Sequence, residues 1–96
     1  MKIPQRLKMF GYDWRVVLSD KDGGSFEWSK LTITLDKKWT EEILIHEILE
    51  MIMVNLNYRF YGQEGNMEYH FFFDHTGLCR IHRELFKILK DNNLLI

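Results

Sequence analysis

Residues 43–56 read ILIHEILEMIMVNL, and this segment decides how the chain folds. Most of its residues are Ile, Leu, Met or Val, a pattern that predicts a helix buried on nearly every side. Three ionisable residues, His46, Glu47 and Glu50, interrupt the apolar pattern. Burying even a neutral polar group without a partner costs on the order of 2–7 kcal/mol. Each of the three side chains therefore needs a partner inside the protein.

The three polar residues share one side of the predicted helix. At about 100° per residue, Glu50 falls close to His46 and Glu47 lies at the edge of the same arc. We therefore expect the three side chains to meet at one place. A His followed four residues later by a second ligand is the spacing of short zinc-binding motifs, in which an intervening Glu acts as the base.

The same spacing also has a purely structural explanation. A His-Glu-x-x-Glu sequence arises by chance in many helices. Glu47 and Glu50 would then pair with Arg or Lys from the sheet, while His46 bonds a backbone carbonyl. Taken by itself, this helix favours the structural explanation.

Length and composition limit the classes of protein to consider. The chain has 96 residues, enough for one domain, residues 1–96, with a two-layer core. Thirteen basic and fourteen acidic residues give a net charge of −1, which makes nucleic acid an unlikely partner. Cys79 is the only cysteine, so no intramolecular disulfide forms. We see neither a signal peptide nor a membrane span and expect a cytoplasmic protein, in the host cell if the gene belongs to a phage.

The first third of the chain predicts β structure. Apolar and polar residues alternate over residues 7–9, 14–18, 26–29 and 31–36, and the cluster DKDGG at residues 20–24 predicts a turn. We expect three or four antiparallel strands that bury one face, and a helix that covers this face.

Two helices follow in the prediction. The central helix runs from about Glu41 to Leu56 with Thr40 as its N-cap, and the last helix runs from His75 or Thr76 to about Asp91. The turn-rich sequence of residues 57–66 predicts an ordered loop, and the sequence of residues 67–73 fits a strand or a helix equally well. The fold class is therefore α+β, with an N-terminal antiparallel sheet packed on the central helix and the C-terminal helix.

His75 offers a third ligand where the chain returns to the core. Together, His46, Glu50 and His75 would make a set of two His and one carboxylate, the composition of an open catalytic zinc site. Iron or manganese would also suit these ligands, and Glu47 would act as general base. We expect the site to lie between the two helices. His70, Cys79 and His82 are alternative ligands with a weaker case, because each also fits a position at the border of the core.

The combination resembles a known group of proteins. A β-rich first half precedes EILIHEILE at residues 42–50, and His75 opens a helix that ends with LKDN at residues 89–92. It resembles small phage and prophage proteins that look like variants of the minimal gluzincin-type metallopeptidases, whose hallmark is HExxH on one helix and a Glu ligand on the next. In the variants the Glu and the second His exchange places. The resemblance implies a zincin-like fold, His46, Glu50 and His75 as zinc ligands, Glu47 as the base and a peptide or protein substrate.

Three functions are consistent with these observations. The leading hypothesis is a zinc-dependent, peptidase-like hydrolase, with residues 59–68 as the segment that would cover its substrate cleft. The second is a non-catalytic metal-binding or protein-interaction module that keeps the zincin-like fold. The third and weakest is a nucleic-acid accessory protein that uses the basic face formed by Arg80, Arg83, Lys87 and Lys90.

Overall fold

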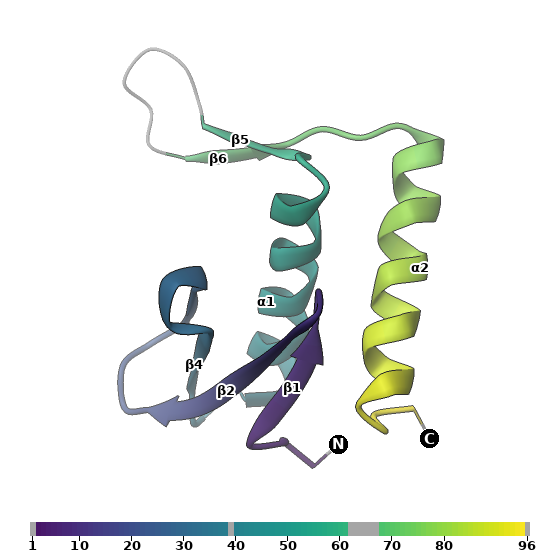
Figure 1. Ribbon diagram of the computed structural model, residues 1–96. Helices are drawn as coiled ribbons and strands as arrows, with labels where there is room; N and C mark the ends of the chain where they lie inside the picture. Colours follow the sequence, from purple (N-terminus) through teal and green to yellow (C-terminus); the bar gives the residue numbers. More distant parts are fainter. Residues whose placement is uncertain (1, 39, 62–67, 96) are drawn as a thin grey trace.

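The computed structural model describes residues 2–38, 40–61 and 68–95. It is an α+β structure with a four-stranded sheet, a two-stranded hairpin and two helices (Figure 1). In chain order its elements are β1 (Arg6–Met9), β2 (Tyr12–Ser19), β3 (Gly24–Glu27), a 3₁₀ turn (Trp28–Lys30), β4 (Thr32–Asp36), α1 (Thr40–Asn55), β5 (Arg59–Tyr61), β6 (Tyr69–Phe71) and α2 (His75–Asp91).

The order of strands in the sheet is β1-β2-β4-β3, and its central pair is parallel. The outer pairs, β1–β2 and β3–β4, are antiparallel, so the prediction of an antiparallel sheet is wrong for β2–β4. The chain leaves β2 for the edge position of β3, and the 3₁₀ turn then brings β4 back between them, with Leu31 in the left-handed region at φ 47°. Trp28 belongs to this turn, so the strand predicted over residues 26–29 ends at Glu27.

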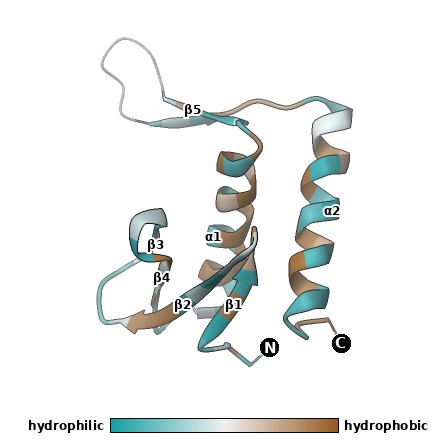
Figure 2. Ribbon diagram, in the orientation of Figure 1, coloured by the Kyte–Doolittle hydropathy of each residue, from teal (hydrophilic) through white to brown (hydrophobic). Residues whose placement is uncertain are grey.

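Between the sheet and the two helices lies the apolar core. The sheet contributes the fully buried ring of Trp14, whose Nε1 donates a hydrogen bond to the Met9 carbonyl oxygen. Figure 2 shows brown, hydrophobic stretches alternating with teal ones along α1 and α2. The buried apolar residues are Leu7, Met9, Trp14, Ile33, Leu35, Leu44, Ile48, Met51, Ile52, Ile81 and Ile88.

One side of α1 is open to solvent, which the sequence did not predict. Ile45 is 41% exposed and His46 is also exposed, whereas Glu47 is buried. A domain of this size has one sheet and one further helix to cover α1, and two neighbours leave part of a helix surface uncovered. The described helices include none that is long and apolar enough to cross a membrane.

Side-chain hydrogen bonds fix both ends of α2. At its start, Asp74 accepts a hydrogen bond from the backbone N–H of Gly77 at 2.8 Å, as an N-cap does. At its end, the Asn92 side chain accepts a hydrogen bond from Lys8 N at 2.7 Å and donates to the Lys8 and Ile88 carbonyl oxygens. Asn92 therefore ties the end of α2 to the backbone of β1.

α1 approaches the sheet closely at Gly24 in β3. A Cβ atom built there would overlap the Ile43 side chain and lie 2.9 Å from Glu47 Oε1 and 3.1 Å from the Thr34 carbonyl oxygen. The absence of a side chain at position 24 lets the helix carry Glu47 against the strand.

We predict that Gly24→Ala lowers the free energy of unfolding by about 1–3 kcal/mol, because Ile43 and the helix must shift to make room. Urea denaturation of the variant and of Ser25→Ala, a control at an exposed neighbouring position, measures the effect. Equal stability of the two variants would show that the helix does not depend on this close approach.

Candidate metal site

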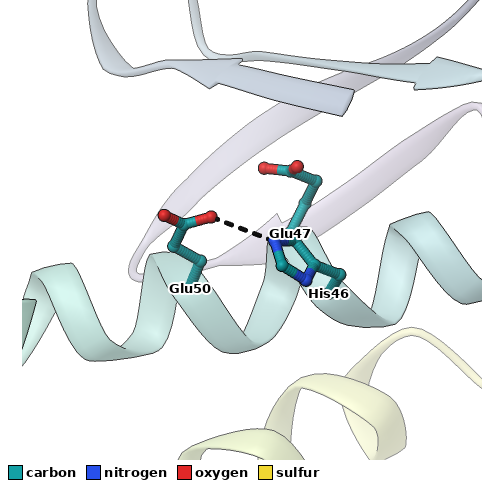
Figure 3. Close-up of side chains that lie close together, drawn as sticks. All are labelled: His46, Glu47 and Glu50. Atoms are coloured by element: carbon teal, nitrogen blue, oxygen red, sulfur yellow. Dashed lines mark ion pairs between the residues drawn. The ribbon is translucent and has the colours of Figure 1, made fainter. Parts of the chain in front are cut away.

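The side chains of His46, Glu47 and Glu50 meet on one side of α1, as their helical spacing predicts. One potential ligand atom from each lies within 4.8 Å of the other two. His46 Nε2 and Glu50 Oε2 are 3.3 Å apart (Figure 3). Two ligands of one tetrahedral zinc ion stand about 3.4 Å apart, given metal–ligand bonds of about 2.1 Å. The His46–Glu50 separation therefore fits a shared ion.

The group faces the strands, so the prediction that it lies between the helices is wrong. In Figure 3 the Glu47 and Glu50 side chains rise from α1 on the side of the strands, with the His46 ring next to them in front of the helix, and the yellow ribbon of α2 lies on the opposite side of α1. Glu47 lies against Gly24 of β3, and Glu50 pairs with a residue of β5. The rotation of α1 on its axis, set by its buried apolar residues, turns these carboxylates towards the strands.

The three residues differ in their exposure to solvent. Glu47 is 4% exposed, while the side chain of Glu50 is 16% exposed and that of His46 is 69% exposed. The group thus extends from the α1–β3 interface to the surface. A ligand could approach from the His46 side without any movement of the core.

Arg59 of β5 holds Glu50 in place, a role that the sequence does not predict. Arg59 Nη1 donates to Glu50 Oε1 at 3.2 Å, which leaves Oε2 directed at His46. The guanidinium also lies 3.9 Å from the ring centroid of Tyr69 and 5.6 Å from that of Phe26. The structural explanation of the motif predicts that Glu50 pairs with a basic residue of the sheet. Glu50 does pair with a basic residue, but this residue belongs to the β5–β6 hairpin and not to the main sheet. The only indication of this role in the sequence is that Arg59 stands among aromatic residues.

Burial and charge together perturb Glu47. Loss of solvent raises the pKa of Glu47 above its ordinary value, and the nearby negative charge of Glu50 raises it further. His46 and Arg59 act in the opposite direction, with smaller effects. A carboxyl group whose pKa is shifted towards neutrality is suited to accept and release a proton.

The structure does not bring His75 into this group. His75 is the first residue of α2, which begins beyond the end of α1 (Figure 1), and its Nδ1 is 3.9 Å from Cys79 Sγ. His70 lies on β6 and His82 on α2, and both are exposed. None of these four residues belongs to the group around His46. The role of His75 as a metal ligand stays a prediction.

One imidazole and two carboxylates make a donor set that zinc, iron and manganese can all accept. Comparisons of the chain with protein-family models, curated proteins and solved structures give no match. The chemistry of the group and the contacts around it are therefore the basis for assigning a function.

We predict that Arg59→Met lowers the free energy of unfolding by about 1–3 kcal/mol, because Glu50 is largely buried and loses the cation that it pairs with. Arg83→Met, at an exposed position of α2, is the control. A double-mutant cycle with Glu50→Gln measures the coupling, and additive effects of the two substitutions would contradict the pairing.

A second prediction concerns pH. Because the pKa of Glu47 is raised in the folded state, the folded protein binds its proton more tightly than the unfolded chain does. Stability from this group is thus present at low pH and declines as pH rises from about 4.5 through the folded pKa. We expect Glu47→Gln to be more stable than the parent protein at neutral pH, with the gain growing over that interval. Urea denaturation from pH 4 to 8 tests this, with the exposed Glu42→Gln as control.

Proposed function

We propose that this protein binds a divalent transition-metal ion, preferentially zinc, through His46 and Glu50. We further propose that it is a peptidase-like hydrolase with Glu47 as general base. The observation that carries the proposal is the 3.3 Å separation of His46 Nε2 from Glu50 Oε2 beside a second, buried carboxylate, that of Glu47. Zincin-like architecture, inferred from the sequence resemblance, is part of the proposal.

Each residue has a distinct task in this proposal. A zinc ion held by His46 and Glu50 would supply Lewis-acid activation of a water molecule and of the scissile carbonyl group. Glu47 takes a proton from the attacking water and delivers it to the leaving amine, a task for which its raised pKa suits it. Arg59 keeps one oxygen of Glu50 occupied, so that the other faces His46. This is how outer-shell partners orient metal ligands.

His75 is the third ligand in the proposed zinc site. In the described structure it lies outside the group around His46, and its addition would complete a set of two His and one carboxylate. The proposal therefore requires the start of α2 to approach α1 when metal binds. If His75 does not take part, Glu47 is the nearest further ligand and cannot also serve as the base.

A non-catalytic metal-binding or interaction module is the second candidate function. The Arg59–Glu50 pair favours it, because Glu50 already has a positively charged partner without a metal ion. The two candidates differ in the role of Glu47. The hydrolase needs Glu47 for catalysis, whereas in the non-catalytic module Glu47 affects only stability.

We expect protein purified without chelator to contain stoichiometric zinc by elemental analysis, and His46→Ala or Glu50→Gln to weaken zinc binding at least about 100-fold. His82→Ala is the control, because His82 is exposed and lies outside the group. His75→Ala should also lose metal while staying folded. Calorimetric titration with zinc measures each affinity, and absence of binding at saturating zinc would contradict the proposal.

Hydrolysis is tested separately with a library of quenched fluorescent peptides. Glu47→Gln should keep the metal and lose at least about 100-fold in rate. Equal rates for parent and variant would remove Glu47 as the base. Metal binding with no hydrolysis of any peptide would favour the non-catalytic candidate.

A further inference from the structure

The β5–β6 hairpin has two faces, and only one of them is used by the metal site. Successive residues of a strand point to opposite sides, so Arg59 and Tyr61 share one face and Phe60 lies on the other. Across the hairpin Phe60 pairs with His70, while Tyr61 pairs with Tyr69, whose ring Arg59 contacts. The Phe60 face is therefore turned away from Glu50, and Phe60 is 51% exposed.

The Phe60 face borders an open cavity of about 490 Å³ next to the start of α2. Its aromatic lining consists of Tyr58, Phe60, Phe72 and Phe73, and Arg80 stands among its lining residues. We call this cavity the aromatic groove. Phe72 is 78% exposed, more than any other large hydrophobic residue of the described chain. In Figure 2 the segment between β6 and α2 is brown as it crosses to the start of the helix.

A row of cations continues from the groove along α2. Arg80, Arg83, Lys87 and Lys90 follow at intervals of three, four and three residues, which places them on one side of the helix. All four are exposed, and within the described residues their side chains make no ion pair or hydrogen bond. At about 1.5 Å per residue this basic stripe is about 15 Å long. Arg80 belongs to both the stripe and the groove, so the two form one continuous surface.

Each part of this surface suits a particular kind of ligand group. Exposed aromatic rings around a cavity take an apolar side chain, which buries them. Four cations in a row along a helix, without ion pairs among the described residues, can pair with carboxylates of a similar spacing. We propose that the aromatic groove and the basic stripe together bind an acidic segment of another protein, with an apolar side chain in the groove and carboxylates along the stripe.

An acidic protein segment fits this surface better than nucleic acid does. Asp74 lines the groove, while Glu84 and Asp91 line a second cavity together with Lys87 of the stripe. These acidic groups would repel the continuous charge of a nucleic acid backbone, and the whole chain carries a net charge of −1. A peptide can place its carboxylates opposite the cations alone. The proposal goes beyond the metal chemistry, because the surface contains none of His46, Glu47 and Glu50.

The probe for this surface is a fluorescein-labelled synthetic peptide of about fifteen residues, with four glutamates one helical turn apart and a terminal phenylalanine. Fluorescence anisotropy with the chelator-treated protein should give saturable binding at low salt that weakens as salt rises. A peptide with glutamines in place of the glutamates should bind roughly tenfold more weakly. Because chelator is present, the outcome is independent of the metal proposal.

Two variants locate the binding site. Phe72→Ser should weaken peptide binding roughly tenfold through loss of the groove contact. The double variant Arg83→Glu/Lys87→Glu should weaken it by at least as much and reduce its salt dependence. Lys21→Glu/Lys38→Glu is the matched control, since it changes the net charge equally at exposed positions of the opposite half of the chain. Circular dichroism verifies that all variants are folded, and amide NMR shifts on peptide addition should cluster over residues 72–90.

Any of three results would overturn the proposal. One is peptide binding that is absent, or equal in the parent protein and both surface variants. Another is tighter binding of single-stranded oligothymidylate than of the peptide through the same stripe, which would make it a nucleic-acid site. The third is self-association that is abolished by Phe72→Ser, which would assign the groove to a second copy of this chain.

Discussion

The ion pair between Arg59 and Glu50 is the contact on which the arrangement of the site depends. It connects α1 to the β5–β6 hairpin, and the cation–π contacts of the guanidinium with Phe26 and Tyr69 add β3 and β6 to the same junction. A planar cation that already lies against aromatic rings loses little further freedom when it bonds a carboxylate. The hairpin is thereby held over α1 at the position where the three ionisable side chains meet.

The junction also explains how ionisable residues are tolerated so near the core. Glu50 has a permanent counter-charge, and His46 retains most of its solvent, so neither bears the full penalty of desolvation. Glu47 receives only partial compensation, and a raised pKa is the result. Such a perturbed carboxyl, within 4.8 Å of two other ionisable groups, is the feature that makes this position of α1 a candidate for chemistry.

Local sequence signals predicted the helices well and the sheet only in part. Apolar periodicity and the residues at the helix ends placed α1 and α2 within one or two residues of their observed limits. The positions of the strands were largely right, but the antiparallel direction was wrong for β2–β4, because β4 shows the same alternation beside a parallel or an antiparallel neighbour. Helical spacing brought together His46, Glu47 and Glu50 correctly. The partner of Glu50 and the position of His75 depend on how distant segments pack, and no periodicity within either segment reports that packing.

The bonds of Asn92 to the backbone of Lys8 join residues that are 84 positions apart. A contact of this kind closes a loop that contains almost the whole chain, so its entropic cost is met only once the segments between have become ordered. Opening of the first strand and of the end of the last helix is consequently coupled. Two ends that would otherwise fray separately act as one cooperative unit, and their amide hydrogens are expected to exchange with solvent at similar rates.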